Sequence, residues 1–273
     1  MNFTVIGASG FIGSALCDSL RASGHSVSAP DRSAGTILDR PLGHVVYAAG
    51  VTADFRTRPF DTFRANTGLV AEILEKDQFD SFLYLSSARL YRHAAQSGEA
   101  TRICVEASDP EDFYDLTKLT SEALCHASGH ASARVVRLAN VVGQDFRSQN
   151  FLYDLIRSAC DSGVIELRSD LASAKDYVLL EDVVRILPMI ALSGRDSCYN
   201  LGSGQNLTHA QLLEPILATT GATLKVVEGA PCVMAPQMDI SKLRNEFGFR
   251  PTPVLPSIAG LINHYRKFAH AQD

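Results

Sequence analysis

A tyrosine and a lysine four residues apart carry the first chemical signal in this sequence. Tyr114 and Lys118 lie in residues 113–128, whose apolar spacing predicts a helix, so both side chains should share one helix face. A phenol has a reference pKa of about 10 and is a poor acid or base at neutral pH, but a nearby ammonium lowers that pKa. The pair therefore indicates general acid–base chemistry, although the spacing alone also occurs by chance.

A strand-end serine strengthens this interpretation. Residues 81–86 form an apolar run typical of a strand, and Ser87 follows it directly, about 27 residues before Tyr114. Polar residues are ordinary at strand ends and on helices, and we interpret Ser86 and Ser121 in that way. Ser87 is kept as a catalytic candidate.

A glycine-rich turn near the start of the chain predicts a phosphate-binding site. Gly7, Gly10 and Gly13 lie between a β-branched run at residues 3–7 and a helical pattern at residues 11–22. Glycine permits the tight turn, the approach of the backbone to a pyrophosphate, and close packing of helix on strand. The helix N-terminus adds unpaired N–H groups and the positive end of its dipole. The turn therefore predicts a dinucleotide site.

An acidic residue about 20 residues further on refines the choice of cofactor. Asp31 follows the predicted strand 26–29, where a carboxylate can accept hydrogen bonds from the adenosine ribose. The same charge repels a 2′-phosphate, so NAD is favoured over NADP. Arg32 and Ser33 come next and could pair with that phosphate, so NADP stays open.

Apolar strands alternate with helices along the first part of the chain. Further strands are expected at 44–49, 81–86 and 134–139, with helices near 59–76 and 113–128. This alternation predicts an α/β fold, a Rossmann-type doubly wound parallel sheet covered on both faces. After about residue 150 the pattern becomes mixed. We therefore expect a dinucleotide-binding domain over 1–150 and a smaller substrate-binding lobe over 151–273, with strands that could return to the main sheet.

Composition excludes several classes of function. A net charge of −5 over 273 residues disfavours a sequence-independent grip on nucleic acid. No apolar run reaches the roughly 18 residues of a membrane span, and the chain opens directly into a strand, so neither a membrane segment nor a signal peptide is expected and the cytoplasm is the expected location. The cysteines show neither a disulfide framework nor a metal-binding spacing, so no metal and buried, reduced thiols are expected; they are Cys17, Cys104, Cys125, Cys160, Cys198 and Cys232.

Taken together, these motifs resemble the extended short-chain dehydrogenase/reductases of the NAD-dependent epimerase/dehydratase family. The Gly-x-x-Gly-x-x-Gly spacing of residues 7–13 is the form found there, and Tyr-x-x-x-Lys matches its catalytic pair. Further matching blocks follow in order over about 250 residues: Ala48 to Gly50, Asn66, Arg137 to Gly143, Lys175 to Val178, Glu181 to Val183, Tyr199 to Gly204, Asp239 to Leu243 and Phe247 to Pro251. The C-terminal blocks are typical of members that act on nucleotide-linked sugars.

The resemblance implies roles for the matching residues. Ser87 would stabilise the reacting oxygen while Tyr114 exchanges its proton, and Lys118 would also hold the nicotinamide ribose. Substrate contacts are expected at Ser87, Ala88, Arg89, Asn140 and Lys175. Cofactor contacts are expected at Gly7, Ser9, Gly10, Phe11, Ile12, Gly13, Asp31, Arg32, Asp39, Ala48, Ala49, Gly50, Asn66, Tyr114 and Lys118.

The resemblance also implies an assembly. Helices 59–76 and 113–128 match those that pair in the family's dimers, so a homodimer is expected. Candidate interface positions, for which core packing is an equally good interpretation, are Phe63, Leu69, Ile73, Leu116, Leu119 and Leu124.

Three departures from the family pattern limit the substrate and the reaction. The stretch before His44 is short, which reduces the third strand to about residues 36–39 with Asp39 as a candidate adenine contact. Ala88 and Arg89 stand where sugar 4,6-dehydratases carry an Asp-Glu pair, which disfavours dehydration. Lys175 replaces an arginine of the diphosphate clamp, and a lysine lacks the bidentate fork. Other cations that could serve the phosphates are Arg147, Arg157 and Arg168.

The sequence leaves three functions open. The leading one is an NAD(P)-dependent 4-epimerase or keto-sugar reductase acting on a nucleotide-linked sugar by hydride transfer. A second is a reductase or dehydrogenase of a non-sugar ketone or alcohol, favoured by the weakened clamp. A third is a cofactor-binding redox sensor without catalysis, although such a protein would be expected to lose Tyr114 or Lys118.

Overall fold

Six parallel strands form the central sheet of the protein. The computed structural model describes residues 1–30, 38–146, 148 and 150–270. The strands of the sheet are β1 (Asn2–Ile6), β2 (Ser26–Ser28), β3 (His44–Tyr47), β4 (Ser81–Ser87), β5 (Ala133–Leu138) and β9 (Cys198–Leu201), in the order β2-β1-β3-β4-β5-β9. Every neighbouring pair is parallel. The expected doubly wound parallel sheet is confirmed.

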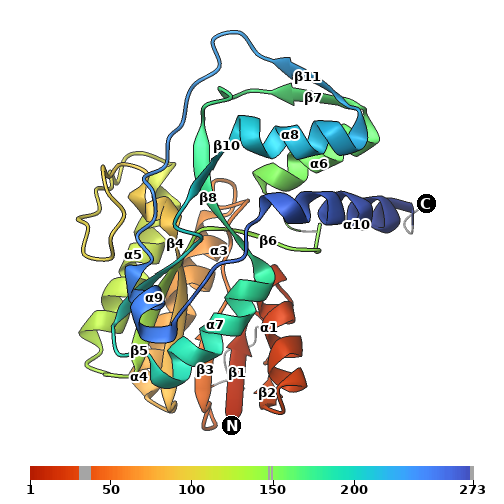
Figure 1. Ribbon diagram of the computed structural model, residues 1–273. Coiled ribbons are helices and arrows are strands. Elements are labelled where there is room, and N and C mark those ends of the chain that lie inside the picture. The colour runs from red at the N-terminus through yellow and green to blue at the C-terminus, as the bar shows by residue number, and fades with distance from the viewer. Residues whose placement is uncertain (31–37, 147, 149, 271–273) are drawn as a thin grey trace.

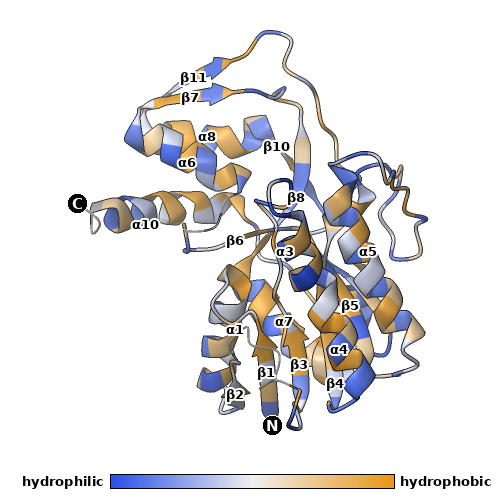
Figure 2. Cartoon of the chain, turned by 180° about the vertical axis from the view of Figure 1, so that it is seen from behind, coloured by the Kyte–Doolittle hydropathy of each residue, from blue (hydrophilic) through white to orange (hydrophobic). Residues whose placement is uncertain are grey.

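Helices cover both faces of this sheet, which explains why its strands are apolar almost throughout. One face carries α1 (Phe11–Ala22), α7 (Leu180–Ser193) and α9 (Ser241–Phe247), whose buried side chains join a single core cluster. The other face carries α4 (Leu69–Lys76) and α5 (Asp112–Ala127) over a second cluster. Figure 1 shows the sheet between these two helix layers. In Figure 2 the strands are mostly hydrophobic, whereas the covering helices carry both hydrophobic and hydrophilic residues.

The helix expected at residues 59–76 consists of three consecutive segments. α3 (Pro59–Phe63) leads into a π-helical turn at Arg64–Gly68, and α4 continues from there. A π turn widens the helix and changes which backbone groups are free to bond elsewhere. This turn contains Asn66 and lies against α5.

A second lobe lies above the carboxyl ends of the sheet strands (Figure 1). Its helices are α6 (Phe151–Asp161), α8 (His209–Thr220) and α10 (Ile258–His270), packed around a third core cluster. Its strands are β6 (Asn140–Val142), β8 (Ala174–Leu179) and β10 (Asn206–Thr208) in one small sheet, and β7 (Val164–Leu167) and β11 (Thr223–Val226) in another. Two short 3₁₀ turns, Ala88–Tyr91 and Leu255–Ser257, complete the elements.

The chain after residue 150 contributes to both lobes. β9 adds to the edge of the main sheet beside β5, and α7 packs on β3 and β4. The second lobe is therefore built from residues that come before α7 and from residues that come after β9.

The short stretch before β3 lies only partly within the described residues. The expected third strand at 36–39 begins among residues outside the described ranges, and Leu38 to Arg40 form a turn rather than a strand. Asp31 and Arg32 also lie outside them.

The expectation of buried thiols is only half right. Cys17, Cys125 and Cys198 are buried, whereas Cys104 and Cys232 are exposed, and all six are free. Both exposed cysteines lie in loops, which run over the protein surface. Among the residues that the structure describes, no helix is both long and apolar enough to span a bilayer.

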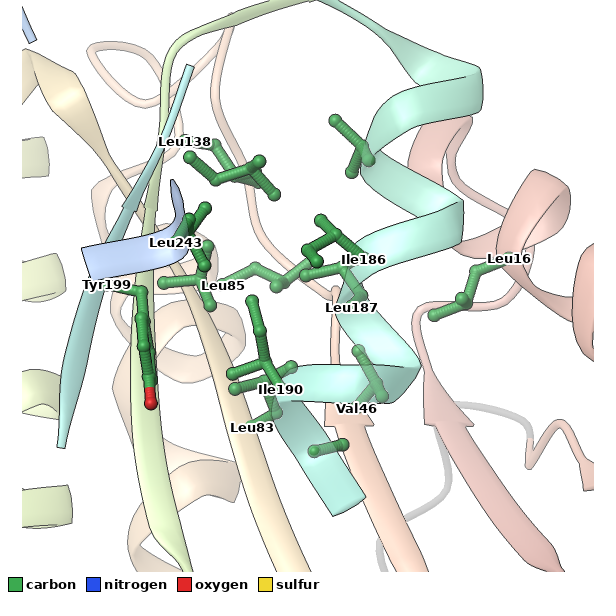
Figure 3. Packing of buried hydrophobic residues seen from close by; sticks show 14 of the residues in the cluster. Leu16, Val46, Leu83, Leu85, Leu138, Ile186, Leu187, Ile190, Tyr199 and Leu243 are labelled. Atoms are coloured by element: carbon green, nitrogen blue, oxygen red, sulfur yellow. The ribbon is translucent and has the colours of Figure 1, made fainter. Parts of the chain in front are cut away.

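We expect α7 to contribute strongly to stability through its buried face. Ile190 is fully buried among the residues drawn in Figure 3, so Ile190→Ala should leave a cavity and lower the free energy of unfolding by about 2–5 kcal/mol. Met189, its neighbour on the same helix, is 41% exposed, and Met189→Ala should change that free energy by about 0.5 kcal/mol or less. Urea denaturation measures both, and equal losses would contradict this packing.

Candidate active site

The strand order creates a crevice at one end of the sheet. The chain leaves β1 for β2 on one side and returns for β3 on the other, so the loops after β1 and β3 diverge at their carboxyl ends. Crevices of this kind are where open α/β sheets bind ligands. Here a cleft of about 830 Å³ opens between these loops, and its walls include Gly7, Ser9 and Gly10 on one side and Ala48 to Gly50 on the other.

The glycine turn has no room for larger side chains. Gly7 has a φ of +87°, and a Cβ there would lie 2.6 Å from the Ala49 nitrogen. A Cβ on Gly13 would lie 2.2 Å from the Gly7 carbonyl oxygen. Gly10 caps α1 without a side-chain hydrogen bond, so the first N–H groups of the helix remain available to an anion. This cradle fits the pyrophosphate of a dinucleotide.

Not every residue of the turn faces the cleft. Phe11 packs edge-on against Tyr153, Ile12 packs on the core beneath α1, and Gly13 is buried behind the turn. The described walls of the cleft include none of these side chains, nor Asp39, which is exposed in the turn before β3. The cofactor contacts expected at these four positions stay predictions.

Tyr114 and Ser87 come together where β4 ends and α5 begins. The tyrosine is only 6% exposed and packs against Phe55, with ring centroids 5.5 Å apart. Burial raises the pKa of Tyr114 to about 12, opposed by a hydrogen bond with the Ser87 side chain and by the charge of Arg89. The phenol is therefore protonated at neutral pH, with a hydroxyl beside it that can share its proton.

Lys118 is buried one helical turn from Tyr114. Its ammonium donates a hydrogen bond of 3.0 Å to the Leu85 carbonyl and lies 4.9 Å from the centre of the Tyr84 ring. Burial lowers the pKa of Lys118 to about 8, and Glu122 acts in the opposite direction. The Lys118 ammonium donates to Leu85 and lies 5.8 Å from the centre of the Tyr114 ring, while the charge of Asp115 raises the pKa of Tyr114 and that of Arg89 lowers it.

Lys118 lies next to the wall of the cleft at Gly50. A Cβ on Gly50 would lie 3.4 Å from the lysine Nζ, and Gly50 itself lines the cleft. α5 thus adjoins the cleft at a position where any larger side chain would intervene.

Asn66 lies behind this wall rather than in it. Its side chain is fully buried, accepts a hydrogen bond from the Val51 N–H, and donates one to Thr117 Oγ1. Its carbonyl oxygen accepts hydrogen bonds from Ser121 Oγ and the Tyr84 hydroxyl. With no exposed surface, Asn66 does not provide the direct cofactor contact expected from sequence. It instead fixes α5 to the loop after β3.

Arg89 is held in an ion-pair network beside the tyrosine. Its guanidinium pairs with Glu111 and Asp115, and it also lies over the Phe55 ring. Both acids are shared with other arginines, since Glu111 pairs with Arg56 and Asp115 with Arg92.

One group of metal-ligating types occurs among the described residues, formed by His93, Asp109 and Asp112. The Arg92 guanidinium pairs with both of these carboxylates, so a cation is already present between them.

Two of the expected substrate residues, Asn140 and Lys175, lie on strands of the second lobe, whereas Ala88 follows β4. Asn140 is exposed and donates a hydrogen bond of 2.8 Å to the Asp176 carbonyl, at the edge between β6 and β8. Lys175 projects from β8 toward the Phe151 ring, and burial together with the charge of Arg89 lowers its pKa. Ala88 is partly buried and packs on the core.

The other candidate clamp arginines are engaged or fall outside the described ranges. Arg157 pairs with Asp154, Arg168 pairs with Glu166 at the surface, and Arg147 is not among the described residues. Lys175 is therefore the better placed cation of the set.

Sequence reasoning missed two features of the site. Phe55, which packs on Tyr114, lies in a loop without any motif. Glu122 and Arg137 form a buried ion pair beside Lys118. The four-residue spacing from Lys118 to Glu122 was a usable signal, because it places both side chains on one helix face.

Comparison with known proteins agrees with this geometry. The chain is 24% identical over 159 residues to dTDP-4-dehydro-6-deoxyglucose reductase of Escherichia coli, covering 54% of this chain and 49% of that protein. It is 22% identical over 216 residues to dTDP-glucose 4,6-dehydratase of Streptomyces niveus, covering 76% of this chain and 62% of that one. The matches therefore span about half to three fifths of these relatives.

Structural comparison gives the same architecture. The structure of MoeE5 in complex with UDP-glucuronic acid and NAD superposes with a TM-score of 0.82 at 23% identity, covering 98% of this chain and 99% of that one. At this identity the likeness speaks for the fold. The model of the NAD dependent epimerase/dehydratase family matches residues 3–202, most of the sheet and the whole catalytic helix, and the chain accordingly belongs to this family.

Proposed function

We propose that this protein is an NAD-dependent oxidoreductase that interconverts a hydroxyl and a keto group on a nucleotide-linked sugar, as a 4-epimerase or a keto-sugar reductase. The observation that carries the proposal is the meeting of Ser87, Tyr114 and Lys118 next to the glycine-lined cleft. A nicotinamide dinucleotide bound in the cleft would supply the hydride chemistry.

The chain's own residues handle the proton. Tyr114 is protonated at neutral pH, so it can donate its proton to a carbonyl oxygen as that oxygen gains charge. Ser87 lies beside the phenol and can hydrogen-bond the same oxygen. Lys118, with a pKa of about 8, is mostly charged at pH 7 and supports the phenolate that remains.

The substrate side of the site supports an anionic ligand. Lys175 lies near the start of α6, with its Nζ 5.9 Å from the centre of the Phe151 ring. His209 stacks on the same ring and is 3% exposed, and among the described residues its Nε2 has no hydrogen-bond partner. The buried Nδ2 of Asn150, the N-cap residue of α6, likewise has no hydrogen-bond partner among the described residues. Buried polar groups are normally satisfied, so a ligand with several acceptor oxygens, such as a diphosphate, fits here.

The surroundings of Ser87 argue against a 4,6-dehydratase. That elimination needs an acid and a base besides the tyrosine, but Ala88 has no such group and Arg89 is committed to Glu111 and Asp115. The dehydratase relative shows that the family includes such chemistry, whereas these residues favour epimerisation or reduction.

Two other functions are weaker. A non-sugar ketone would leave the Lys175 and His209 groups without a role. A redox sensor without catalysis would have no use for a phenol placed against Ser87. We further propose a cytoplasmic location, as expected from the sequence.

The proposed acid–base role of Tyr114 is testable by removing one hydroxyl. Tyr114→Phe should keep the fold and NAD binding but lower turnover by roughly 10²–10⁴-fold, the usual contribution of a positioned acid–base group. Turnover is first sought with a panel of UDP- and dTDP-linked hexoses. Tyr199→Phe is the matched control, because Tyr199 is a buried tyrosine on β9 whose hydroxyl donates to Glu246 on α9. A Tyr114→Phe enzyme that retains the parental rate would refute the mechanism.

The proposed preference for NAD depends on Asp31. The parent protein should bind NADH more tightly than NADPH, since a carboxylate repels a 2′-phosphate, and Asp31→Ala should narrow that difference. Calorimetry with both cofactors measures it. Asp18→Ala, at an exposed position on α1, should leave the ratio unchanged. Tighter NADPH binding by the parent would reverse the assignment and favour reduction over epimerisation.

We propose that α3, α4 and α5 form a homodimer interface. Phe60 and Phe63 are 76% and 50% exposed on α3, and Leu116 and Leu119 are partly exposed on α5, whereas Ile73 is fully buried and belongs to the core. Exposed aromatic side chains of this size favour a partner surface.

Light scattering tests this assembly. The parent should have a mass of about 59 kDa, twice the 29.5 kDa of one chain. Phe60→Glu/Phe63→Glu should give the single-chain mass, because two charges would be buried in the interface. Met189→Glu, on the opposite face of the sheet, should remain dimeric. A parent of 29.5 kDa at micromolar concentration would exclude the dimer.

A further inference from the structure

A buried ion pair lies one turn beyond Lys118 on the catalytic helix. Arg137 on β5 donates through Nε to Glu122 Oε1 at 3.0 Å and through Nη2 to Oε2 at 2.6 Å. The Glu122 side chain is 4% exposed and the Arg137 side chain is 7% exposed. A bidentate pair with so little exposure is well defined in geometry and weakly screened by solvent.

The pair is the centre of a network that crosses the sheet. The other Arg137 nitrogen donates to the Tyr91 hydroxyl at 2.9 Å, and Tyr91 donates to Asn200 Oδ1 on β9 at 2.8 Å. The Asn200 amide then donates to the Ser97 and Asp239 carbonyls. These hydrogen bonds tie α5 to strands β5 and β9, to the 3₁₀ turn that contains Tyr91, and to the loops that contain Ser97 and Asp239.

Tyr114, Lys118 and Glu122 lie at four-residue intervals and so share one face of α5. The titratable groups around the Lys118 ammonium are Glu122 on its own helix, Tyr114 one turn earlier, and Tyr84 on β4. Around Glu122 lie Arg137 on β5, Cys125 on α5 and Cys198 on β9. Glu122 is the one carboxyl group among these, and burial raises the pKa of both tyrosines and both thiols.

We propose that Glu122 and Arg137 are positioning residues, whose ion pair keeps the buried Lys118 ammonium charged and in place and locks the catalytic helix to β5 and β9. Glu122 supplies the negative charge, and Arg137 holds its carboxylate in place through hydrogen bonds to both oxygens. The inference rests on the proposed function only for the importance of Lys118 in turnover.

The effect of Glu122 on the pKa of Lys118 can be measured without substrate. In full-length protein labelled with ¹³C-lysine, the ε-carbon resonance reports the protonation of each lysine, and Lys118→Arg identifies the signal. The parent midpoint should lie at pH of about 8. Glu122→Gln keeps the size of the side chain but removes its charge, so the midpoint should fall by roughly 1 pH unit. Glu122→Asp keeps the charge in a shorter side chain, so its midpoint should stay near that of the parent.

A purely structural role predicts the reverse order. The isosteric Gln would then be the milder change and Asp the more disruptive one, and a Glu122→Gln midpoint equal to the parent's would overturn the proposal. Asp182→Asn is the matched control, since Asp182 is a buried acid paired with Arg185 on α7, across the sheet. Its Lys118 midpoint should equal the parent's.

A second variant covers the case in which Glu122→Gln does not fold. Glu122→Met/Arg137→Met replaces both charges by apolar groups and avoids a lone buried ion. Its Lys118 midpoint should still fall, by less than in Glu122→Gln, and an unchanged midpoint in this folded variant would refute the inference. If the midpoints move as expected but no UDP- or dTDP-linked hexose is converted, the proposed function fails and the ion-pair role stands.

Discussion

The buried ammonium of Lys118 is the constraint on which the site depends. Removing a charge from water costs several kcal/mol unless hydrogen bonds and opposite charge compensate it. Here the Leu85 carbonyl, two aromatic faces and the Glu122 carboxylate surround it. Each of these groups comes from β4 or from α5 itself, so the contacts of Lys118 hold α5 against β4. The same packing puts Tyr114 beside Ser87 and brings Lys118 to the wall of the cleft at Gly50.

The parallel sheet then determines what faces this charge. The crossover from β2 to β3 separates the glycine turn from the loop after β3, and the cleft opens between them. The Asn66 carbonyl lies in the π turn before α4, and Ser121 on α5 and Tyr84 on β4 donate hydrogen bonds to it. The cofactor crevice and the catalytic helix are thus parts of one hydrogen-bonded unit, which explains why a fully buried asparagine belongs to the site without touching a ligand.

The second lobe supplies a different chemistry. Its small sheet presents Lys175 near Phe151 and His209, away from acidic partners in the described part of the chain, whereas Arg89 nearby is neutralised by Glu111 and Asp115. Lys175 is therefore the cation that we propose for an anionic ligand, whereas Arg89 is part of the ion-pair network around Tyr114. Substitution of an arginine by Lys175 therefore changes the geometry of anion binding, and the adjoining imidazole and amide nitrogens add hydrogen-bonding capacity.

Much of this protein follows from local sequence. The glycine spacing, the apolar strands and the Tyr-x-x-x-Lys face predicted the parallel sheet, the turn and the helix that carries Tyr114 and Lys118, because each depends on residues close in the chain. Only the tertiary structure showed that Asn66 is buried, that Phe11 and Ile12 turn into the core, and that Arg89 is already paired. It also joined Glu122 to Arg137, 15 residues apart on a helix and the next strand. Burial and ion pairing depend on which surfaces meet, and no spacing along the chain specifies that.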